Sequence, residues 1–260
     1  MELADFMQDM ARGAGQIVKD RYHTAKTWKQ KTDRGDIVTE VDELSEAYIV
    51  ERIIKDYPSH CIMCEEGGML GNEAGDYVWI IDPVDGTRNY MMGIPFFCVS
   101  IGIARNGVAE MGAIYDPIHD EMFFAERGKG AFLNGVKITV SAEKSLEDSL
   151  VNVSWVKRKV DGKKFVRYVE EISKDTSYFR RMGSAALVMA YVADGRMDAY
   201  MQGGLNPWDV AAGVVLIEEA GGVVTDFKNR PIDLTKKDIE IVTANPDIHG
   251  ILMNKIIGHH

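Results

Sequence analysis

Apolar residues near the N-terminus recur at the spacing of an α-helix, and a series of short apolar runs follows them. Residues 3–18 predict an amphipathic first helix, and residues 42–56 predict a second helix that Pro58 closes. The apolar face expected of the second helix consists of Leu44, Ala47, Tyr48, Val50 and Ile54. Strand-like runs come next, at residues 61–64, 78–81, 98–104, 112–115, 121–126 and 138–140. The first half therefore predicts two helices followed by a mostly antiparallel sheet.

Helical and strand-like segments alternate in the second half of the chain, which is typical of an α/β layer. The segment 141–149 between the halves is polar and charged, so we place a domain boundary there and divide the chain into residues 1–145 and 146–260. Two αβ halves that share one site are expected. Strands are predicted at residues 150–153, 199–201, 223–225 and 239–243, and helices at residues 163–172, 184–194 and 207–220.

The composition is that of an ordinary globular protein, with 260 residues of which 46% are hydrophobic and 27% charged. Lys and Arg number 30 and Asp and Glu number 40, and the net charge of −10 argues against a nucleic-acid binder. No apolar run approaches the ~18 residues that cross a bilayer. Glu2 and Asp5 stand where a signal peptide would be basic, so a cytoplasmic protein is expected.

The three cysteines, Cys61, Cys64 and Cys98, are few and odd in number, which indicates reduced thiols. Cys61 and Cys64 form a lone C-x-x-C, but positions three apart in a strand point to opposite faces. Because no second Cys or His pair lies nearby in the sequence, packing in the core is preferred over a redox or zinc role.

The candidate chemistry begins with two acids, Asp82 and Asp85, that follow the apolar run 78–81. Pro83 cannot continue a central strand, so both acids are expected on the turn where the strand ends. Gly86 and Thr87 then begin a predicted helix, whose exposed N–H groups suit a phosphate. A strand end, two acids and a Gly-Thr turn therefore predict a compact site for an anion and a cation.

Three further acids occur where a strand ends or a helix begins. Glu65 and Glu66 follow the run 61–64, and Asp209 lies in the first turn of the helix that Asn206 and Pro207 open. Taken singly, Asp209 suits the helix dipole and the two glutamates suit a solvated turn. If the acids converge, however, their oxygen donors select Mg²⁺, Mn²⁺ or Ca²⁺ rather than zinc.

The chain resembles the inositol monophosphatase family of metal-dependent sugar-phosphate phosphatases, over nearly its whole length. Glu65-Glu66 resembles the Glu-Glu pair of the family, and residues 82–87 resemble its Asp-Pro-hydrophobic-Asp-Gly-Thr signature. Residues 207–213 resemble its second signature, Trp-Asp followed by small residues and Gly. Further matches are the upstream Lys31, Thr39 and Asp42 and the substrate-side loop Gly183, Ser184, Ala185 and Ala186.

The resemblance implies an α+β fold, a layered αβαβα sandwich, usually dimeric, with the site between its halves. Glu65, Asp82 and the Val84 carbonyl would hold one Mg²⁺, and Asp82, Asp85 and Asp209 a second, with Asp42 and Glu66 near a third and Mn²⁺ as a substitute. Further implied roles are phosphate binding by Gly86 and Thr87, proton transfer by Thr87, Glu65 and Asp42, and substrate binding by Asp85, Gly183, Ser184 and Gln202.

The implied reaction is Mg²⁺-dependent hydrolysis of a phosphate monoester by a metal-activated water, with inhibition by lithium. Inositol 1-phosphate or a related sugar phosphate is the first candidate substrate. Gln202 stands where inositol-specific relatives typically carry Glu, and it keeps an acceptor but loses the charge. Fructose-1,6-bisphosphate, histidinol phosphate, NADP and 3′-phosphoadenosine 5′-phosphate therefore stay open. A regulatory binding protein on the same scaffold is the alternative of another class.

Overall fold

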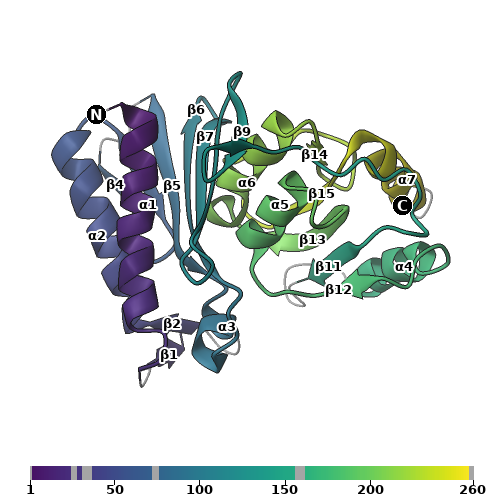
Figure 1. Ribbon diagram of the computed structural model, residues 1–260, viewed down its shortest axis with the longest axis horizontal. Helices are drawn as coiled ribbons and strands as arrows, with labels where there is room; N and C mark the ends of the chain where they lie inside the picture. Colours follow the sequence, from purple (N-terminus) through teal and green to yellow (C-terminus); the bar gives the residue numbers. More distant parts are fainter. Residues whose placement is uncertain (1, 25–27, 31–36, 72–75, 156–161, 258–260) are drawn as a thin grey trace.

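Five layers of secondary structure stack along the molecule (Figure 1). The computed structural model describes residues 2–24, 28–30, 37–71, 76–155 and 162–257. A helix pair, an eight-stranded sheet, a second helix pair, a five-stranded sheet and a third helix pair follow one another. The predicted αβαβα sandwich is confirmed. Within the described part of the chain, no helix is long and apolar enough to cross a membrane.

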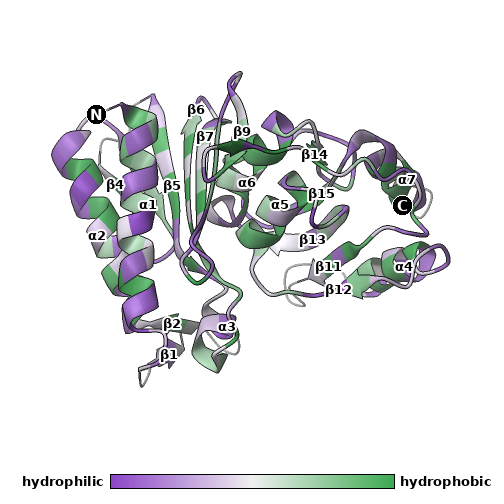
Figure 2. Ribbon diagram, viewed as in Figure 1, coloured by the Kyte–Doolittle hydropathy of each residue, from purple (hydrophilic) through white to green (hydrophobic). Residues whose placement is uncertain are grey.

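The outer helix pair consists of α1 (Leu3–Asp20) and α2 (Glu40–Asp56), which cover one face of the large sheet. The apolar side of α1 is buried as its spacing predicts, with Phe6, Met7 and Met10 at the centre of the contact. Hydrophilic residues line the outer sides of both helices, and hydrophobic residues line the sheet beneath them (Figure 2).

The face expected to be buried on α2 was wrong. Leu44 and Ile54 are exposed, whereas Asp42, Ser45 and Glu46 are buried together with apolar residues of the next turns. The hydroxyl of Ser45 donates to the Pro83 carbonyl at 3.0 Å, so the helix turns a polar stripe toward the loop that follows the strands. Hydrogen bonds of the buried polar side chains therefore decide which face of α2 is buried, and Leu44 and Ile54 stay exposed as a result.

The large sheet has the strand order β10-β9-β8-β7-β6-β5-β3-β4 and is mostly antiparallel, as predicted. A separate hairpin pairs β1 (Trp28–Gln30) with β2 (Ile37–Thr39). The strand expected at residues 138–140 was wrong, since a short β10 precedes it. The bounds are β3 (Cys61–Cys64), β4 (Gly68–Gly71), β5 (Tyr77–Asp85), β6 (Cys98–Arg105), β7 (Val108–Asp116), β8 (Glu121–Glu126), β9 (Gly130–Leu133) and β10 (Val136–Lys137).

Strand β5 does not end at Pro83, which corrects the expectation that Asp82 and Asp85 lie on a turn beyond it. Asp82 pairs with Ser100 and Asp85 pairs with Cys98, with a register shift between the two pairs. The shift is a bulge, where the missing N–H of proline breaks no ladder bond. The strand therefore carries both acids to its carboxyl end.

The central helices α5 (Ala185–Ala193) and α6 (Pro207–Glu219) pack between the two sheets and are buried on nearly all sides. Two glycines paired across β6 and β7, Gly102 and Gly112, let α6 approach the large sheet closely. A side-chain carbon at Gly112 would lie 2.5 Å from the backbone oxygen of Ala212, closer than atoms pack. This contact sets the position of the first turn of α6.

The small sheet has the order β12-β11-β13-β15-β14, and β12, β11 and β13 run parallel. Helices α4 (Gly162–Ile172) and α7 (Pro246–Ile257) cover its outer face, and α7 and β12 were not predicted. The strands are β11 (Val151–Trp155), β12 (Phe179–Arg180), β13 (Ala199–Leu205), β14 (Val223–Thr225) and β15 (Ile239–Ala244).

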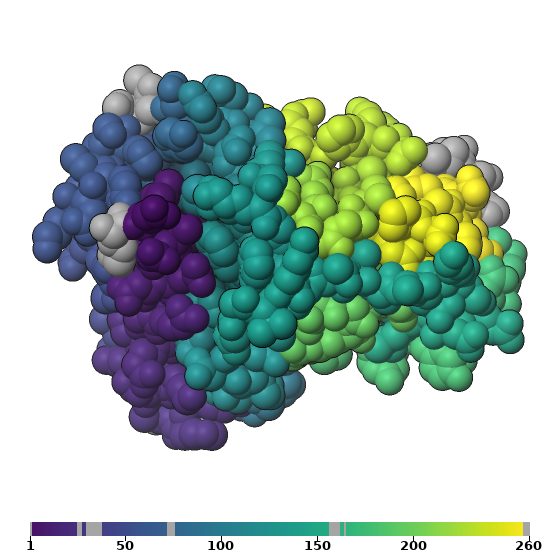
Figure 3. Space-filling model, turned by 45° about the horizontal axis from the view of Figure 1, so that its top comes forward, coloured from purple at the N-terminus to yellow at the C-terminus, as the bar shows by residue number. Residues whose placement is uncertain are grey.

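The N-terminal residues, in purple, and the C-terminal residues, in yellow, occupy opposite sides of the molecule (Figure 3). Residues 138–150 contain no helix or strand and join the last strand of the large sheet to the first strand of the small one. The division into domains at residues 145 and 146 stays a prediction, because α6 belongs to the second part of the chain yet packs on the large sheet.

Candidate active site

Three carboxylates from two distant parts of the chain meet between the large sheet and α6. Asp82, Asp85 and Asp209 each offer an oxygen, and these oxygens all lie within 4.8 Å of one another. Asp82 and Asp85 are buried and Asp209 is half-buried. At that separation two unit charges repel by about 3 kcal/mol at an effective dielectric of about 20. The cluster is therefore suited to cations or to bound protons.

Asp82 is the most deeply placed member of the cluster, with 2% of its surface exposed. Its Oδ1 accepts a hydrogen bond from the Val84 backbone N–H at 3.0 Å, inside the bulge of β5. Burial raises the pKa of Asp82 well above its ordinary value, and the charges of Glu65, Asp85 and Asp209 raise it further. A bound cation would reverse both effects.

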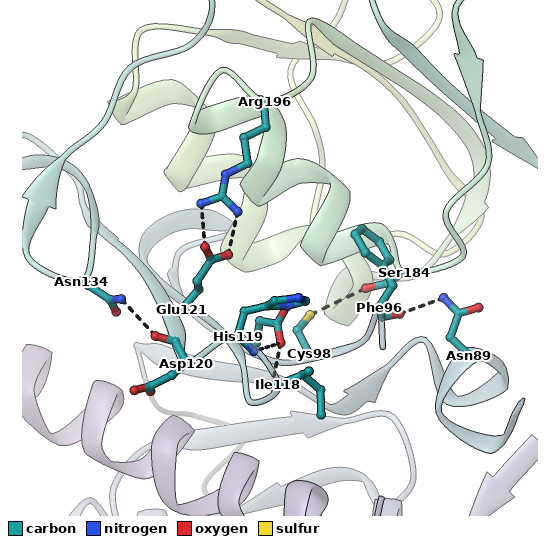
Figure 4. Close-up of polar contacts among 11 residues, drawn as sticks. Asn89, Phe96, Cys98, Ile118, His119, Asp120, Glu121, Asn134, Ser184 and Arg196 are labelled. Atoms are coloured by element: carbon teal, nitrogen blue, oxygen red, sulfur yellow. Dashed lines mark hydrogen bonds and ion pairs between the residues drawn. The ribbon is translucent and has the colours of Figure 1, made fainter. Parts of the chain in front are cut away.

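Asp85 is held by the N-terminus of α5. Its Oδ2 accepts hydrogen bonds from the Ser184 hydroxyl at 2.6 Å and from the Ala186 backbone N–H at 2.7 Å. The Cys98 thiol lies 3.8 Å from both Asp85 Oδ2 and Ser184 Oγ, and the contact with Ser184 is drawn in Figure 4. Burial raises the pKa of Asp85 to about 6, although these hydrogen bonds act in the opposite direction.

Asp209 reaches the cluster from the first turn of α6. Its Oδ2 accepts a hydrogen bond from the Asn206 backbone N–H at 2.6 Å, which completes a capping box at this helix end. The expected helix start at Pro207 is confirmed. The helix dipole alone would satisfy Asp209, but the close approach of α6 at Gly102 and Gly112 also brings it to Asp82 and Asp85.

Asp42 and Thr87 form a second hydrogen-bonded group beside the acid cluster. The Thr87 hydroxyl lies 3.1 Å from Asp42 Oδ1 and 3.0 Å from the Val84 carbonyl oxygen. The other oxygen of Asp42 accepts from the Thr39 hydroxyl and, at 3.0 Å, from the Thr39 backbone N–H. Burial and, to a smaller extent, the charge of Glu65 raise the pKa of Asp42 to about 6, against the lowering effect of the Thr39 hydrogen bonds.

The two glutamates that follow β3 are positioned by a residue that the sequence did not single out. Glu46 of α2 accepts hydrogen bonds from the backbone N–H groups of Glu66 at 2.9 Å and Gly67 at 2.7 Å. The Glu65 N–H donates to the Ile81 carbonyl at 3.2 Å, so Glu65 starts beside the end of β5. The signal available in the sequence was the spacing of Asp42 and Glu46, which puts both acids on the same side of the predicted helix, one turn apart.

Two glycines shape the backbone around the acids. Gly86 has φ 95° and precedes α3 (Thr87–Met92). A side-chain carbon added at Gly86 would lie 3.1 Å from the Phe96 carbonyl oxygen. Gly183 has φ 85° and lies against the Asn89 side chain. Asn89 donates to the carbonyl oxygens of Phe96 at 2.8 Å, drawn in Figure 4, and Met182 at 2.7 Å. Asn89 therefore ties α3 to the loop that carries Gly183.

Gln202 lies on β13, at the carboxyl ends of the parallel strands of the small sheet, where α/β proteins commonly place their ligands. Its Oε1 accepts a hydrogen bond from the buried Tyr200 hydroxyl. Burial raises the pKa of Tyr200, and the charges of Asp85 and Asp209 add to the effect. Gln202 thus contacts a tyrosine whose hydroxyl is influenced by two acids of the cluster. Lys31 lies outside the described residues.

The cysteines take the places expected of core residues. Cys61, Cys64 and Cys98 are free and buried. Burial raises the pKa of the Cys98 thiol, and the charges of Asp85 and Asp82 raise it further, which disfavours the reactive thiolate. Cys98 packs beside the acid cluster as a neutral neighbour.

The donor set of the site fits hard divalent cations. The clustered oxygens come from carboxylates, and the Val84 carbonyl oxygen adds a neutral oxygen beside them. Buried like charges at this spacing favour a bound cation. What the arrangement offers chemically is a cation site, a hydrogen-bonded hydroxyl at Thr87 and a helix start at Gly86 and Thr87.

Comparison with known proteins agrees with this geometry. The sequence model of the inositol monophosphatase family matches residues 1–259. Nus factor SuhB of Escherichia coli (strain K12) is 41% identical over 219 residues, covering 84% of this chain and 82% of that protein.

Solved structures share the fold. Extragenic suppressor protein suhB from Bartonella henselae has a TM-score of 0.91 at 35% identity, with 97% of each chain covered. Inositol monophosphatase from Anabaena (Nostoc) has a TM-score of 0.86 at 38% identity, covering 98% of this chain and 95% of that one.

Proposed function

Because the chain belongs to the inositol monophosphatase family, we propose that it hydrolyses a phosphate monoester with the help of bound Mg²⁺. The observation that carries the proposal is the meeting of Asp82, Asp85 and Asp209 within 4.8 Å, next to the Thr87–Asp42 hydrogen bond. The preferred substrate class is inositol 1-phosphate or a related sugar phosphate.

Glu65, Asp82 and the Val84 carbonyl would hold one Mg²⁺, and Asp82, Asp85 and Asp209 a second. Asp42 and Glu66 would lie near a third, and Mn²⁺ would substitute. When bound, the ions supply positive charge that acidifies water and stabilises the phosphate and leaving-group oxygens. The cluster supports this assignment because each acid has a fixed backbone partner: Val84 for Asp82, Ala186 for Asp85 and Asn206 for Asp209.

Thr87 and Glu65 are assigned as the groups that accept the proton of the attacking water. The Thr87 Oγ1 donates its own proton toward Asp42 Oδ1, 3.1 Å away, which leaves a lone pair free to accept from water. Asp42 orders the hydroxyl rather than touching the substrate.

The phosphate is assigned to the backbone N–H groups of Gly86 and Thr87, and the leaving group to Gly183, Ser184 and Gln202, with Asp85 between them. The Ser184 hydroxyl donates to Asp85 at 2.6 Å, so it acts on the substrate side through that carboxylate. Gln202 offers a neutral amide to the leaving group. A carboxylate at this position, as in inositol-specific relatives, would restrict which leaving groups fit. Fructose-1,6-bisphosphate, histidinol phosphate, NADP and 3′-phosphoadenosine 5′-phosphate are the alternative substrates.

A panel of these phosphate monoesters tests the proposal, with phosphate release measured with and without Mg²⁺. We expect turnover that requires the metal and is inhibited by lithium, and a homodimer by light scattering. If none of the esters is hydrolysed with either Mg²⁺ or Mn²⁺, the catalytic assignment is wrong.

A second candidate function is regulatory binding to another protein. The observation that favours it is the name Nus factor carried by the relative in Escherichia coli, which is 41% identical. Partner capture with the wild type and with Asp85→Asn separates the two functions, since a partner bound equally by an inactive variant does not depend on turnover. Capture that is lost together with turnover would count against a separate binding function.

A further inference from the structure

Ser100 of β6 has a buried hydroxyl directly opposite Asp82. The two residues are partners in the β5–β6 ladder, and opposite residues of an antiparallel pair point to the same face of the sheet. Ser100 is 0% exposed, and its Oγ has no hydrogen-bond partner among the described residues. Opposite side chains start about 5 Å apart at Cβ, so one rotamer change brings a hydroxyl to a carboxylate.

The neighbours of Ser100 on the same face locate it beneath the acid cluster. Two residues before it, the Cys98 thiol lies 3.8 Å from Asp85 Oδ2. Two residues after it, a side-chain carbon at Gly102 would lie 2.8 Å from Cβ of Ala211, in the first turns of α6. Ser100 therefore lies between the contact to Asp85 and the helix that carries Asp209.

A buried hydroxyl without a partner is unfavourable, and alanine would fill the same space without that penalty. The serine becomes favourable once it has an acceptor, and Asp82 is the carboxylate across the ladder. Oδ1 of Asp82 accepts a backbone hydrogen bond from Val84, which fixes one side of the carboxylate. A second donor would fix the other side, as donors behind metal-binding groups generally do.

We infer that Ser100 is a positioning residue: after a rotamer change its hydroxyl donates to Asp82 and orients this carboxylate for the cations of the active site. The inference rests on the proposed function, because it assumes that Asp82 binds metal. Ser100 does not touch the substrate, so its effect falls on the affinity for metal and on the Mg²⁺ dependence of turnover.

The test compares Ser100→Ala with the wild type by isothermal titration of the metal-free protein with Mg²⁺ and Mn²⁺. We expect about tenfold weaker binding in the variant, together with an unchanged or higher melting temperature of the metal-free protein. Turnover of the best ester should need more Mg²⁺ and recover at saturating metal. Ser100→Thr keeps the hydroxyl and should keep most of the affinity.

Thr243→Val is the matched control, because Thr243 Oγ1 is a second buried hydroxyl without a partner among the described residues, on the small sheet. This variant should bind Mg²⁺ as the wild type does. Equal Mg²⁺ affinity in Ser100→Ala and wild type overturns the inference, as does an equal loss in Thr243→Val. A wild type that binds neither metal instead overturns the proposed function.

Discussion

The Ser184 hydroxyl donates a hydrogen bond of 2.6 Å to Asp85, a residue 99 positions earlier in the chain. The bond joins the end of β5 in the large sheet to the N-terminus of α5, which packs against both sheets. Because Asp85 is also a member of the acid cluster, any movement between these layers changes the geometry of the proposed cation site.

Replacing Ser184 by Ala should weaken Mg²⁺ binding at pH 7 by about tenfold, since a hydrogen bond to a charged group contributes about 1.5–3 kcal/mol. In the wild type the hydrogen bond from Ser184 lowers the pKa of Asp85. The pKa of Asp85 should therefore be higher in the variant, which lacks this bond. Titration calorimetry between pH 5.5 and 8 measures both effects. Ser173→Ala, whose exposed hydroxyl donates to the Glu170 carbonyl, is the control and should leave binding unchanged.

Replacing Asp82 by Asn should reduce kcat/KM by at least about 10³-fold, which corresponds to about 4 kcal/mol of lost transition-state stabilisation. The same change removes a buried charge that the neighbouring acids oppose. The metal-free variant should therefore melt at a higher temperature than the metal-free wild type. Steady-state kinetics and calorimetry check the two effects. Wild-type turnover in this variant would contradict the metal assignment, and Asp148→Asn on the surface serves as the control.

The metal-free protein should lose stability as the pH rises through the range from about 4 to about 6. Burial raises the pKa values of Asp42 and Asp85 from 3.8 to about 6, so the folded state binds more protons there than the unfolded chain. Stability falls with pH wherever the folded state binds the extra protons. Bound Mg²⁺ should oppose this loss because it favours the ionised carboxylates.

Melting temperatures measured from pH 4.5 to 8, with and without Mg²⁺, test this dependence. The increase in melting temperature that Mg²⁺ produces should become larger as the pH rises. Asp85→Asn lacks one of the two groups and should show a shallower dependence in the absence of metal. A metal-free wild type that becomes more stable between pH 5 and 7 would contradict the raised pKa values.

Replacing Gly112 by Ala should lower the free energy of unfolding by about 1–3 kcal/mol, because the added methyl group forces α6 away from the sheet. Asp209 would move with the helix, so Mg²⁺ affinity should fall as well. Denaturant unfolding and calorimetry measure the two losses. Gly250→Ala in α7 is the matched control: it meets open space and should stabilise the helix by up to about 1 kcal/mol.

Local spacing predicted most of the helices and strands because neighbours in the chain settle these elements. The strand at residues 121–126 and the helix beginning at Pro207 have the expected bounds or start. The prediction failed where distant residues decide the outcome. Strand β5 passes Pro83 because β6 offers a bulged register. Helix α2 buries Asp42 and Glu46 because the Thr87 hydroxyl and the Glu66 backbone N–H, both from later elements, donate to them.

The candidate site divides in the same way. The sequence placed Glu65, Asp82, Asp85 and Asp209 at the ends of elements, which identified them as candidates. It did not single out Glu46 or Ser100, whose partners lie far along the chain. Tyr200 was not singled out either, although it bonds Gln202 two residues later.

The sequence by itself determined most of the helices and strands, the acids that follow or open them and, through its two signatures, the family to which the chain belongs. Only the tertiary structure decided that Asp209 meets Asp82 and Asp85. That meeting depends on Gly102 and Gly112, which are paired across two strands and leave room for α6. The spacing of residues along the chain fixes geometry over a few residues only. Strand register and the close packing of helices on sheets bring together residues that lie far apart in the sequence.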